Sequence, residues 1–168
     1  RGAGRVVECC SASRSGLVAA SFTELGEAEG GWLRGQREAV FLERRAAHLH
    51  DVSDLLPPLP ADGLRLTIVD AGADLDAIRR CGWLADLLVG VPVVVVAGGT
   101  LPGLRRLETL LAGLDSDADA TVAVVGPSRR RWPKALSFSV GPLARTLDAA
   151  GRLVAVPLDR RLALHGLD

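Results

Sequence analysis

Short apolar runs that alternate with helix-like segments are the feature that most constrains the fold of this chain. The clearest run, residues 93–96, consists of four consecutive valines between Pro92 and the glycine pair Gly98 and Gly99. A run without polar residues is typical of a strand that is buried on both faces, as in a parallel sheet covered by helices. The alternation of such strands with helices predicts an α/β fold with a doubly wound, mainly parallel sheet. We expect five or six strands with helices on both faces.

The positions of the elements follow from the same patterns and from glycine and proline breakers. We expect strands at residues 5–10, 39–42, 64–69, 93–96, 120–125 and 153–156. We expect helices at residues 16–28, 74–89, 100–114 and 141–150, with a helical fragment after residues 157–159. Loops or irregular segments are expected at residues 30–35, 48–63 and 126–134.

Length and charge limit the kind of protein that this chain can be. Its 168 residues, 48% of them apolar, are enough to bury the core of a single domain over residues 1–168, which we expect to be truncated at the C-terminus. The formal net charge is zero, so bulk electrostatics attract neither nucleic acid nor an anionic membrane. The longest apolar run, residues 84–99, is interrupted by Asp86, Gly90 and Pro92 and predicts no membrane span.

The three cysteines, Cys9, Cys10 and Cys81, indicate a reducing compartment. Their number is odd and no Cys-x-x-Cys spacing occurs. Adjacent cysteines in a buried strand are most often small core residues. We therefore expect a cytoplasmic protein without disulfides.

The segment at residues 5–20 runs from an apolar strand through a loop of small polar residues into an apolar helix start. In α/β proteins this order places backbone N–H groups around a phosphate at the helix N-terminus. The candidate anion-binding residues are the loop serines with their neighbouring arginine and glycine: Ser11, Ser13, Arg14, Ser15 and Gly16. Arg14 could replace the lysine of a P-loop, because guanidinium groups bind phosphate strongly.

The same loop lacks two parts of a working P-loop, whose pattern is G-x-x-x-x-G-K-[ST]. With Gly16 as the second glycine, Leu17 and Val18 stand where the lysine and the magnesium-binding hydroxyl belong. The only lysine of the chain is Lys134. Phosphoryl transfer depends on positioning and electrostatic stabilisation, so the loss of both groups predicts a loss of turnover.

Three later motifs, in the right order, resemble the MinD/ParA family of deviant P-loop ATPases. The strand that ends in Asp70-Ala71-Gly72 is similar to the Walker B region of that family. The valine strand with the Thr-Leu-Pro-Gly-Leu-Arg-Arg segment at residues 100–106 resembles the strand and helix that come next. Residues 152–159 resemble the last strand and the loop that follows it.

The resemblance spans residues 64–168 and implies the roles of three further residues. Asp70 would be the Walker B carboxylate, although a strand-end aspartate can equally cap the turn that follows it. Pro157 and Asp159 would lie beside the nucleotide base.

The departures from the family pattern resemble its atypical members, such as the TadZ/CpaE-like proteins of pilus assembly and MinD-like proteins encoded beside actinobacterial conjugation and secretion genes. The implied function is that of a non-catalytic pseudo-ATPase, a docking or localisation platform in a bacterial envelope, pilus, secretion or DNA-transfer system. We expect no catalytic residue, no bound metal and no cofactor, with weak ATP or ADP binding as the alternative. The expected partners are other proteins, including a second copy in a homodimer.

Two other functions stay open at this point. The first is an active or weakly active ATPase that uses Arg14, or a residue from a partner subunit, in place of the missing lysine. The second is a Rossmann-like enzyme that binds a dinucleotide or a methyl donor. The glycine-rich run at residues 98–103 follows a strand and opens a helix, but its spacing is not G-x-G-x-x-G.

Two polar clusters carry weaker functional hypotheses. The basic segment Arg129-Arg130-Arg131 beside Trp132 could contact phosphate and stack a base, but in a neutral chain such a loop is more typical of a protein contact. We therefore expect no nucleic-acid partner. His48 and His50 have no further histidine or paired cysteine at a suitable spacing and predict no metal site.

Overall fold

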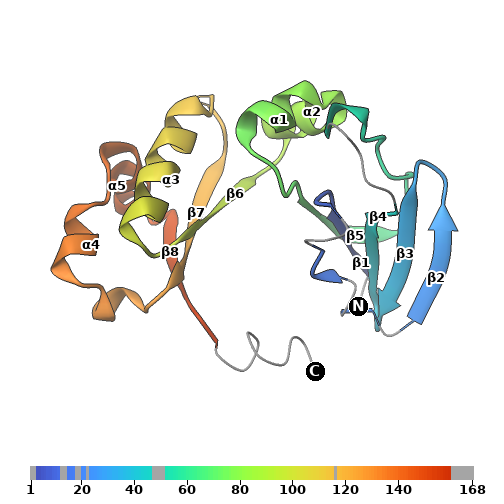
Figure 1. Ribbon diagram of the computed structural model, residues 1–168, viewed down its shortest axis with the longest axis horizontal. Helices are drawn as coiled ribbons and strands as arrows, with labels where there is room; N and C mark the ends of the chain where they lie inside the picture. The colour runs from blue at the N-terminus through green and yellow to red at the C-terminus, as the bar shows by residue number, and fades with distance from the viewer. Residues whose placement is uncertain are drawn as a thin grey trace. The chain divides into compact units, whose positions relative to one another are not determined.

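The computed structural model describes residues 3–11, 15–17, 20–21, 23–46, 52–115 and 117–159. The described residues fall into two compact units that divide between Asp86 and Leu87 (Figure 1). The first unit contains a five-stranded sheet and the second a three-stranded sheet. The prediction of one doubly wound, mainly parallel sheet is therefore wrong, although the α/β class holds.

The sheet of the first unit is mixed, with the strand order β2-β3-β4-β1-β5. β1, the strand next to the edge strand β5, runs parallel to β4 on one side and to β5 on the other. β2, β3 and β4 form an antiparallel meander. The strands are β1 (Ala3–Glu8), β2 (Thr23–Ala28), β3 (Trp32–Arg37), β4 (Val40–Arg45) and β5 (Leu64–Asp70).

The meander replaces the helix that we expected at residues 16–28. Residues 23–28 form β2 instead, and Gly30 and Gly31 form a hairpin turn rather than the end of a helix. Both glycines have positive φ angles, 77° and 75°, which only glycine adopts without strain. β3 lies where a loop was expected, whereas the short strand expected at residues 39–42 is confirmed as part of β4.

A buried ion cluster joins β1 to the meander. Arg5 Nε on β1 donates a 2.9 Å hydrogen bond to Glu43 Oε2 on β4. Arg34 Nε on β3 donates a 2.8 Å hydrogen bond to the other carboxylate oxygen. Arg5 and Glu43 are both buried, so each charge needs the other to offset the cost of its removal from water. The cluster therefore fixes the order of three strands.

The helical segment of the first unit is interrupted where we expected a continuous helix over residues 74–89. α1 (Leu75–Arg80) begins at Asp74, whose side chain accepts a 2.8 Å hydrogen bond from the Ala77 N–H. Cys81 has an extended backbone and separates α1 from α2 (Gly82–Gly90). A short 3₁₀ turn, η3 (Val52–Asp54), precedes β5.

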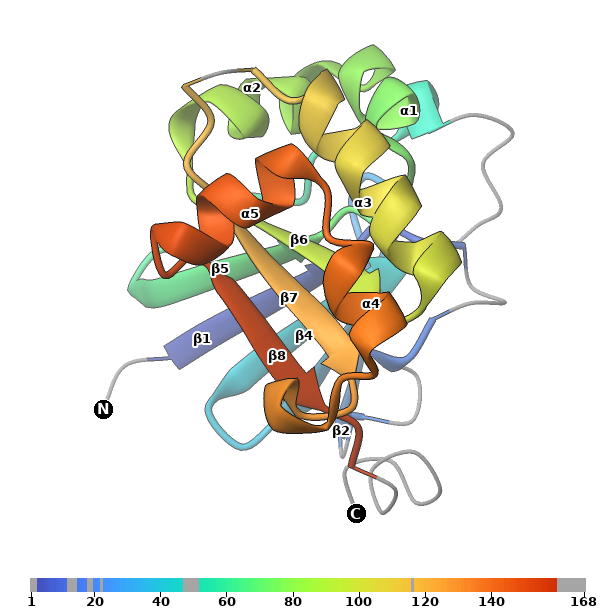
Figure 2. The ribbon, with the colours of Figure 1, turned by 90° about the vertical axis from the view of Figure 1, so that its left-hand side faces the viewer.

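The second unit follows the sequence-based expectation closely. Its parallel sheet has the order β6-β7-β8, and α3, α4 and α5 lie on one face of it (Figure 2). The strands are β6 (Val93–Gly98), β7 (Ala120–Gly126) and β8 (Leu153–Pro157). The helices are α3 (Leu101–Gly113), α4 (Lys134–Phe138) and α5 (Pro142–Ala149), with the 3₁₀ turn η4 (Arg129–Arg131) before α4.

The core of this unit lies between the sheet and the helices. Alternate strand residues contribute to it, including Val95, Val122 and Val124. The α3 leucines Leu104 and Leu107 pack against them. The residues between these strand positions face the opposite side of the sheet, because the side-chain period of a strand is two.

Glu108 of α3 forms the cap of α5. One carboxylate oxygen accepts a 2.7 Å hydrogen bond from the Leu143 N–H and the other a 3.2 Å bond from the Ala144 N–H. A side chain at Gly141 would overlap the Glu108 carboxylate, so the glycine leaves the space that the cap needs. The acidic group also lies at the favourable end of the helix dipole.

We predict that Glu108→Ala lowers the free energy of unfolding by about 1–2 kcal/mol, because the first N–H groups of α5 lose their acceptor. Gly141→Ala should cost a similar amount by displacing the carboxylate. The double variant should lose much less than the sum, because both changes remove one interaction. Urea denaturation followed by circular dichroism measures the free energy of unfolding of each variant.

Glu29→Ala, at an exposed position in the hairpin turn, is the matched control and should have little effect. Additive losses in the double variant would contradict the coupling of Glu108 to Gly141.

Candidate functional site

The turn after β1 is closed by the last residue of that strand. The Glu8 side chain is 6% exposed. Its Oε1 accepts a 2.9 Å hydrogen bond from the Gly16 N–H, and its Oε2 accepts a hydrogen bond from the Ser15 hydroxyl. These donors belong to the loop that the sequence predicts to bind phosphate. An internal carboxylate therefore occupies the donors that a phosphate would use.

A buried cation lies beside the start of the same turn. Arg45, at the end of β4, is 7% exposed, and its Nη1 donates a 3.1 Å hydrogen bond to the Cys9 carbonyl oxygen. Its Nε has no hydrogen-bond partner among the described residues. Since β1 and β4 are parallel, their carboxyl ends lie at the same sheet edge. Arg45 therefore lies at the carboxyl edge of the sheet beside Cys9, whereas the pairing register places Arg44 beside Glu8.

Asp70 ends β5 at this edge and shapes the next turn. Its backbone carbonyl accepts a 2.8 Å hydrogen bond from the Cys9 N–H, and its Oδ1 accepts a 3.1 Å bond from the Gly72 N–H. Gly72 has φ +58°, and a Cβ there would lie 2.6 Å from Cys10 Cβ. The Asp-x-Gly motif therefore has a structural role, in which Asp70 caps the turn and Gly72 gives room to Cys10.

The predicted site residues are only partly brought together. Ser15 and Gly16 meet Glu8, and Ser11 lies in the same loop without regular secondary structure. Ser13 and Arg14 lie outside the described residues, as do His48 and His50. Pro157 ends β8 and Asp159 follows it, both exposed and in the second unit.

Sequence reasoning missed Glu8 and Arg45, the two buried charged residues nearest the turn. An acidic residue at the end of a buried strand is a usable signal, because a buried carboxylate needs donors close by. Arg45 gave no such signal, since it stands among polar neighbours and reaches the turn only through strand pairing.

The basic segment of the second unit is used internally in part. The Arg129 guanidinium pairs with the Asp148 carboxylate and lies 4.1 Å from the centroid of the Trp132 ring. Trp132 is buried, and its Nε1 donates a 2.9 Å hydrogen bond to the Pro127 carbonyl oxygen. A tryptophan held in this way offers no open ring to a nucleic-acid base.

The glycine-rich run before α3 forms a tight strand-to-helix turn. A Cβ at Gly103 would overlap the Gly98 carbonyl, and the Gly103 N–H donates a 3.1 Å hydrogen bond to Thr100 Oγ1. Packing and helix capping thus account for these glycines without a bound dinucleotide.

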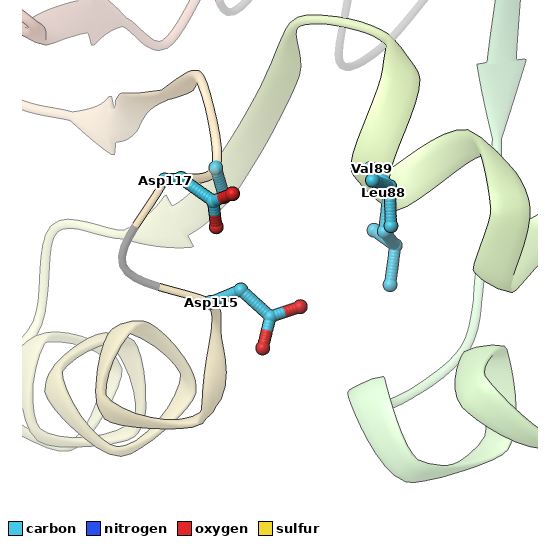
Figure 3. A pocket seen from close by; sticks show the side chains of 5 residues that line it. Leu88, Val89, Asp115 and Asp117 are labelled. Atoms are coloured by element: carbon cyan, nitrogen blue, oxygen red, sulfur yellow. The ribbon is translucent and has the colours of Figure 1, made fainter.

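One hollow in the second unit has a volume of about 330 Å³. Figure 3 shows Asp115 and Asp117 opposite the apolar side chains of Leu88 and Val89. Over the described parts of the chain, no group of three histidine, cysteine or acidic side chains is placed to hold a metal ion. Nor is any helix in those parts both long and apolar enough to cross a membrane.

We find no known protein family, no curated protein and no solved structure that matches this chain.

The environment of Cys9 leads to a prediction about thiol reactivity. Burial, followed by the nearby Cys81 and Asp70, raises the pKa of the Cys9 thiol from 9.0 to about 12. At pH 8 roughly one part in ten thousand of this group is thiolate, the reactive form. We expect native protein treated with iodoacetamide at pH 8 to be modified at half-buried Cys10 and not at Cys9 or buried Cys81. Fragmentation of the tryptic peptide at residues 6–14 by tandem mass spectrometry identifies the site, because this peptide contains both Cys9 and Cys10.

Full modification after unfolding in urea is the control. The raised pKa also means that the ionisation of Cys9 does not change the stability well below pH 9, and that the stability falls as the pH rises from about 9 towards 12. Rapid alkylation of Cys9 in the native protein would contradict the described burial.

Proposed function

We propose that this protein is a non-catalytic docking module that works through contacts with other proteins, as the resemblance to atypical MinD/ParA-like proteins implies. The observation that carries the proposal is an apolar sheet face in the second unit that no described element of that unit covers. The setting in a bacterial envelope, pilus, secretion or DNA-transfer system, and the cytoplasmic location, rest on the sequence resemblance and composition alone.

The absence of turnover is supported by the residues of the turn. The one lysine of the chain, Lys134, begins α4 in the second unit, not the loop after β1. Ser15 and Gly16 donate to Glu8. A nucleotide would have to displace this carboxylate without a loop lysine to hold its β- and γ-phosphates.

The uncovered face is built from strand residues that alternate with the core. Val94 and Val96 on β6 are 62% and 68% exposed, and Val154 and Val156 on β8 are 50% and 39% exposed. The pairing of β6 with β7 and of β7 with β8 places Ala123 between Val96 and Val154. The patch is continuous across three strands and contains no charged residue, which is typical of an interaction surface.

The partner that fits this face best is a second copy of the chain. An uncharged apolar patch can pair with itself around a two-fold axis, because no like charges oppose each other. The zero net charge of the chain adds no repulsion between copies.

We predict that the wild-type protein is a dimer and that Val96→Glu shifts it towards monomer. A carboxylate placed in an apolar interface without a partner should raise the dissociation constant at least about tenfold. Sedimentation velocity over a range of protein concentrations measures the shift.

Val89→Glu is the matched control. Val89 is 80% exposed and lies on α2, outside the sheet face. It should leave the dimer intact. A wild-type monomer at all concentrations, or release of phosphate from ATP, would contradict the proposed function.

A further inference from the structure

The segment that follows β7 concentrates positive charge in one part of the second unit. No acidic residue occurs between Asp119 and Asp148, and this interval contains five cationic side chains. They are Arg129, Arg130, Arg131, Lys134 and Arg145. Because the whole chain is neutral, the excess is local. A local basic cluster attracts acidic partners to the surface that carries it.

Three of these cations are exposed and unpaired. Arg130, Arg131 and Lys134 are all exposed, and none of their side chains forms an ion pair or a hydrogen bond with the described residues. Arg129 differs, because its guanidinium pairs with the Asp148 carboxylate. The other three charges therefore remain available to a ligand from outside the chain.

The backbone that carries these cations is held in place. Trp132 is buried, and its Nε1 donates a 2.9 Å hydrogen bond to the Pro127 carbonyl oxygen. The Arg131 N–H donates a 2.8 Å hydrogen bond to the Ser128 carbonyl oxygen, which closes the turn η4. A segment that is anchored in this way has little backbone entropy left to lose when a partner binds.

Phe138 adds an apolar contact beside the cations. It ends α4 and is 77% exposed. It stands four residues after Lys134, so the two side chains are neighbours on the helix surface. Arg145 of α5 donates a 3.3 Å hydrogen bond to the Phe138 carbonyl oxygen and brings a further cation close to it. Exposed aromatic residues and arginines together are typical of protein interfaces.

We propose that a surface formed by Arg130, Arg131, Lys134 and Phe138, here called the α4 surface, binds an acidic segment of a partner protein. Carboxylates of that segment pair with the three cations, and an apolar side chain between the carboxylates packs on the Phe138 ring. This proposal rests on the proposed docking function and adds the chemistry of one partner. The α4 surface shares no residue with the valine face of β6 and β8.

Nucleic acid and an anionic membrane fit the α4 surface less well. Trp132 belongs to the core of the unit and offers no open ring to a base. Within η4 and α4, which the structure describes completely, Phe138 is the only exposed large apolar side chain. An amphipathic helix that lies in a membrane buries an apolar face, not a single side chain. A run of carboxylates with one apolar contact is the better match.

The test is fluorescence anisotropy of a labelled peptide, in which runs of glutamate flank one leucine, during titration with the whole chain. The wild type should bind saturably at about 50 mM salt and more weakly at about 200 mM, because salt screens the ion pairs. Arg130→Glu combined with Arg131→Glu should raise the dissociation constant at least about tenfold. Phe138→Ala should raise it about fivefold or more and should remove the preference for this peptide over an all-glutamate one.

Matched variants separate the α4 surface from general charge and exposure. Arg105→Glu with Arg106→Glu makes the same charge change at two adjacent exposed arginines of α3 and should change the dissociation constant less than about threefold. Val89→Ala removes an exposed apolar side chain from α2 and should have no effect on peptide binding.

Several results would overturn the proposal. The first is a wild type that does not bind the peptide saturably, and the second is equal weakening by the two double arginine variants. Tighter binding of single-stranded DNA, or of phosphatidylglycerol vesicles, would assign the α4 surface to nucleic acid or to a membrane instead. A shift towards monomer in the variant with Arg130→Glu and Arg131→Glu would assign it to a second copy of the chain.

The failure of this proposal differs from the failure of the proposed function. Without peptide binding, the wild type would still form a dimer and lack turnover. A monomeric wild type or ATP hydrolysis would overturn the proposed function itself. Val96→Glu, which changes the valine face, should leave peptide binding unchanged, so the two surfaces are tested separately.

Discussion

A buried carboxylate must find hydrogen-bond donors, and this requirement at Glu8 determines the candidate site. The side chain stands at the end of the inner strand β1, where water is excluded from it. Its two hydrogen-bond donors are in the loop that β1 leads into, at Ser15 and Gly16. By satisfying Glu8, the loop folds back on its own strand. A loop of this composition thus forms a closed turn.

The same sheet carries its other buried charges in a different way. Arg5, Glu43 and Arg34 neutralise one another across β1, β4 and β3, which ties the antiparallel meander to the parallel part of the sheet. Replacing one member would leave an unpaired buried charge, so the cluster specifies which strands meet. Arg45 lies outside this cluster and reaches the turn after β1. Charge pairing, in addition to apolar packing, therefore sets the geometry of the sheet edge.

The two units differ in how much of them the sequence could predict. In the second unit, local signals are strong and agree: the Thr100 cap, the valines of β6 and Gly151 after α5 mark elements that the structure confirms. In the first unit, residues 23–28 have no apolar face, and their strand pairing depends on β3. The glycine pair that follows is compatible with a helix end or a hairpin turn, and only tertiary pairing decides between them.

The sequence draws attention to the loop after β1 but not to the residue that closes it. The order of strand and small polar loop points to Ser15 and Gly16, whose donors the structure places against Glu8. The lack of turnover that the missing lysine predicts stays a prediction. Glu8 was read as one residue of an apolar strand, and Arg45 stands 37 residues further along the chain. Arg45 reaches Cys9, the residue after Glu8, because β1 pairs in parallel with β4, a strand that the meander separates from it in sequence.

The most direct measurement of the central claim is the nitrogen-15 NMR signal of the Gly16 amide in the wild-type protein during titration with inorganic phosphate. If the Glu8 carboxylate already accepts this N–H, the signal will stay in place while phosphate is added, and its amide proton will exchange slowly with solvent. A saturable shift of the Gly16 signal would show that the turn is open to phosphate and would contradict the account.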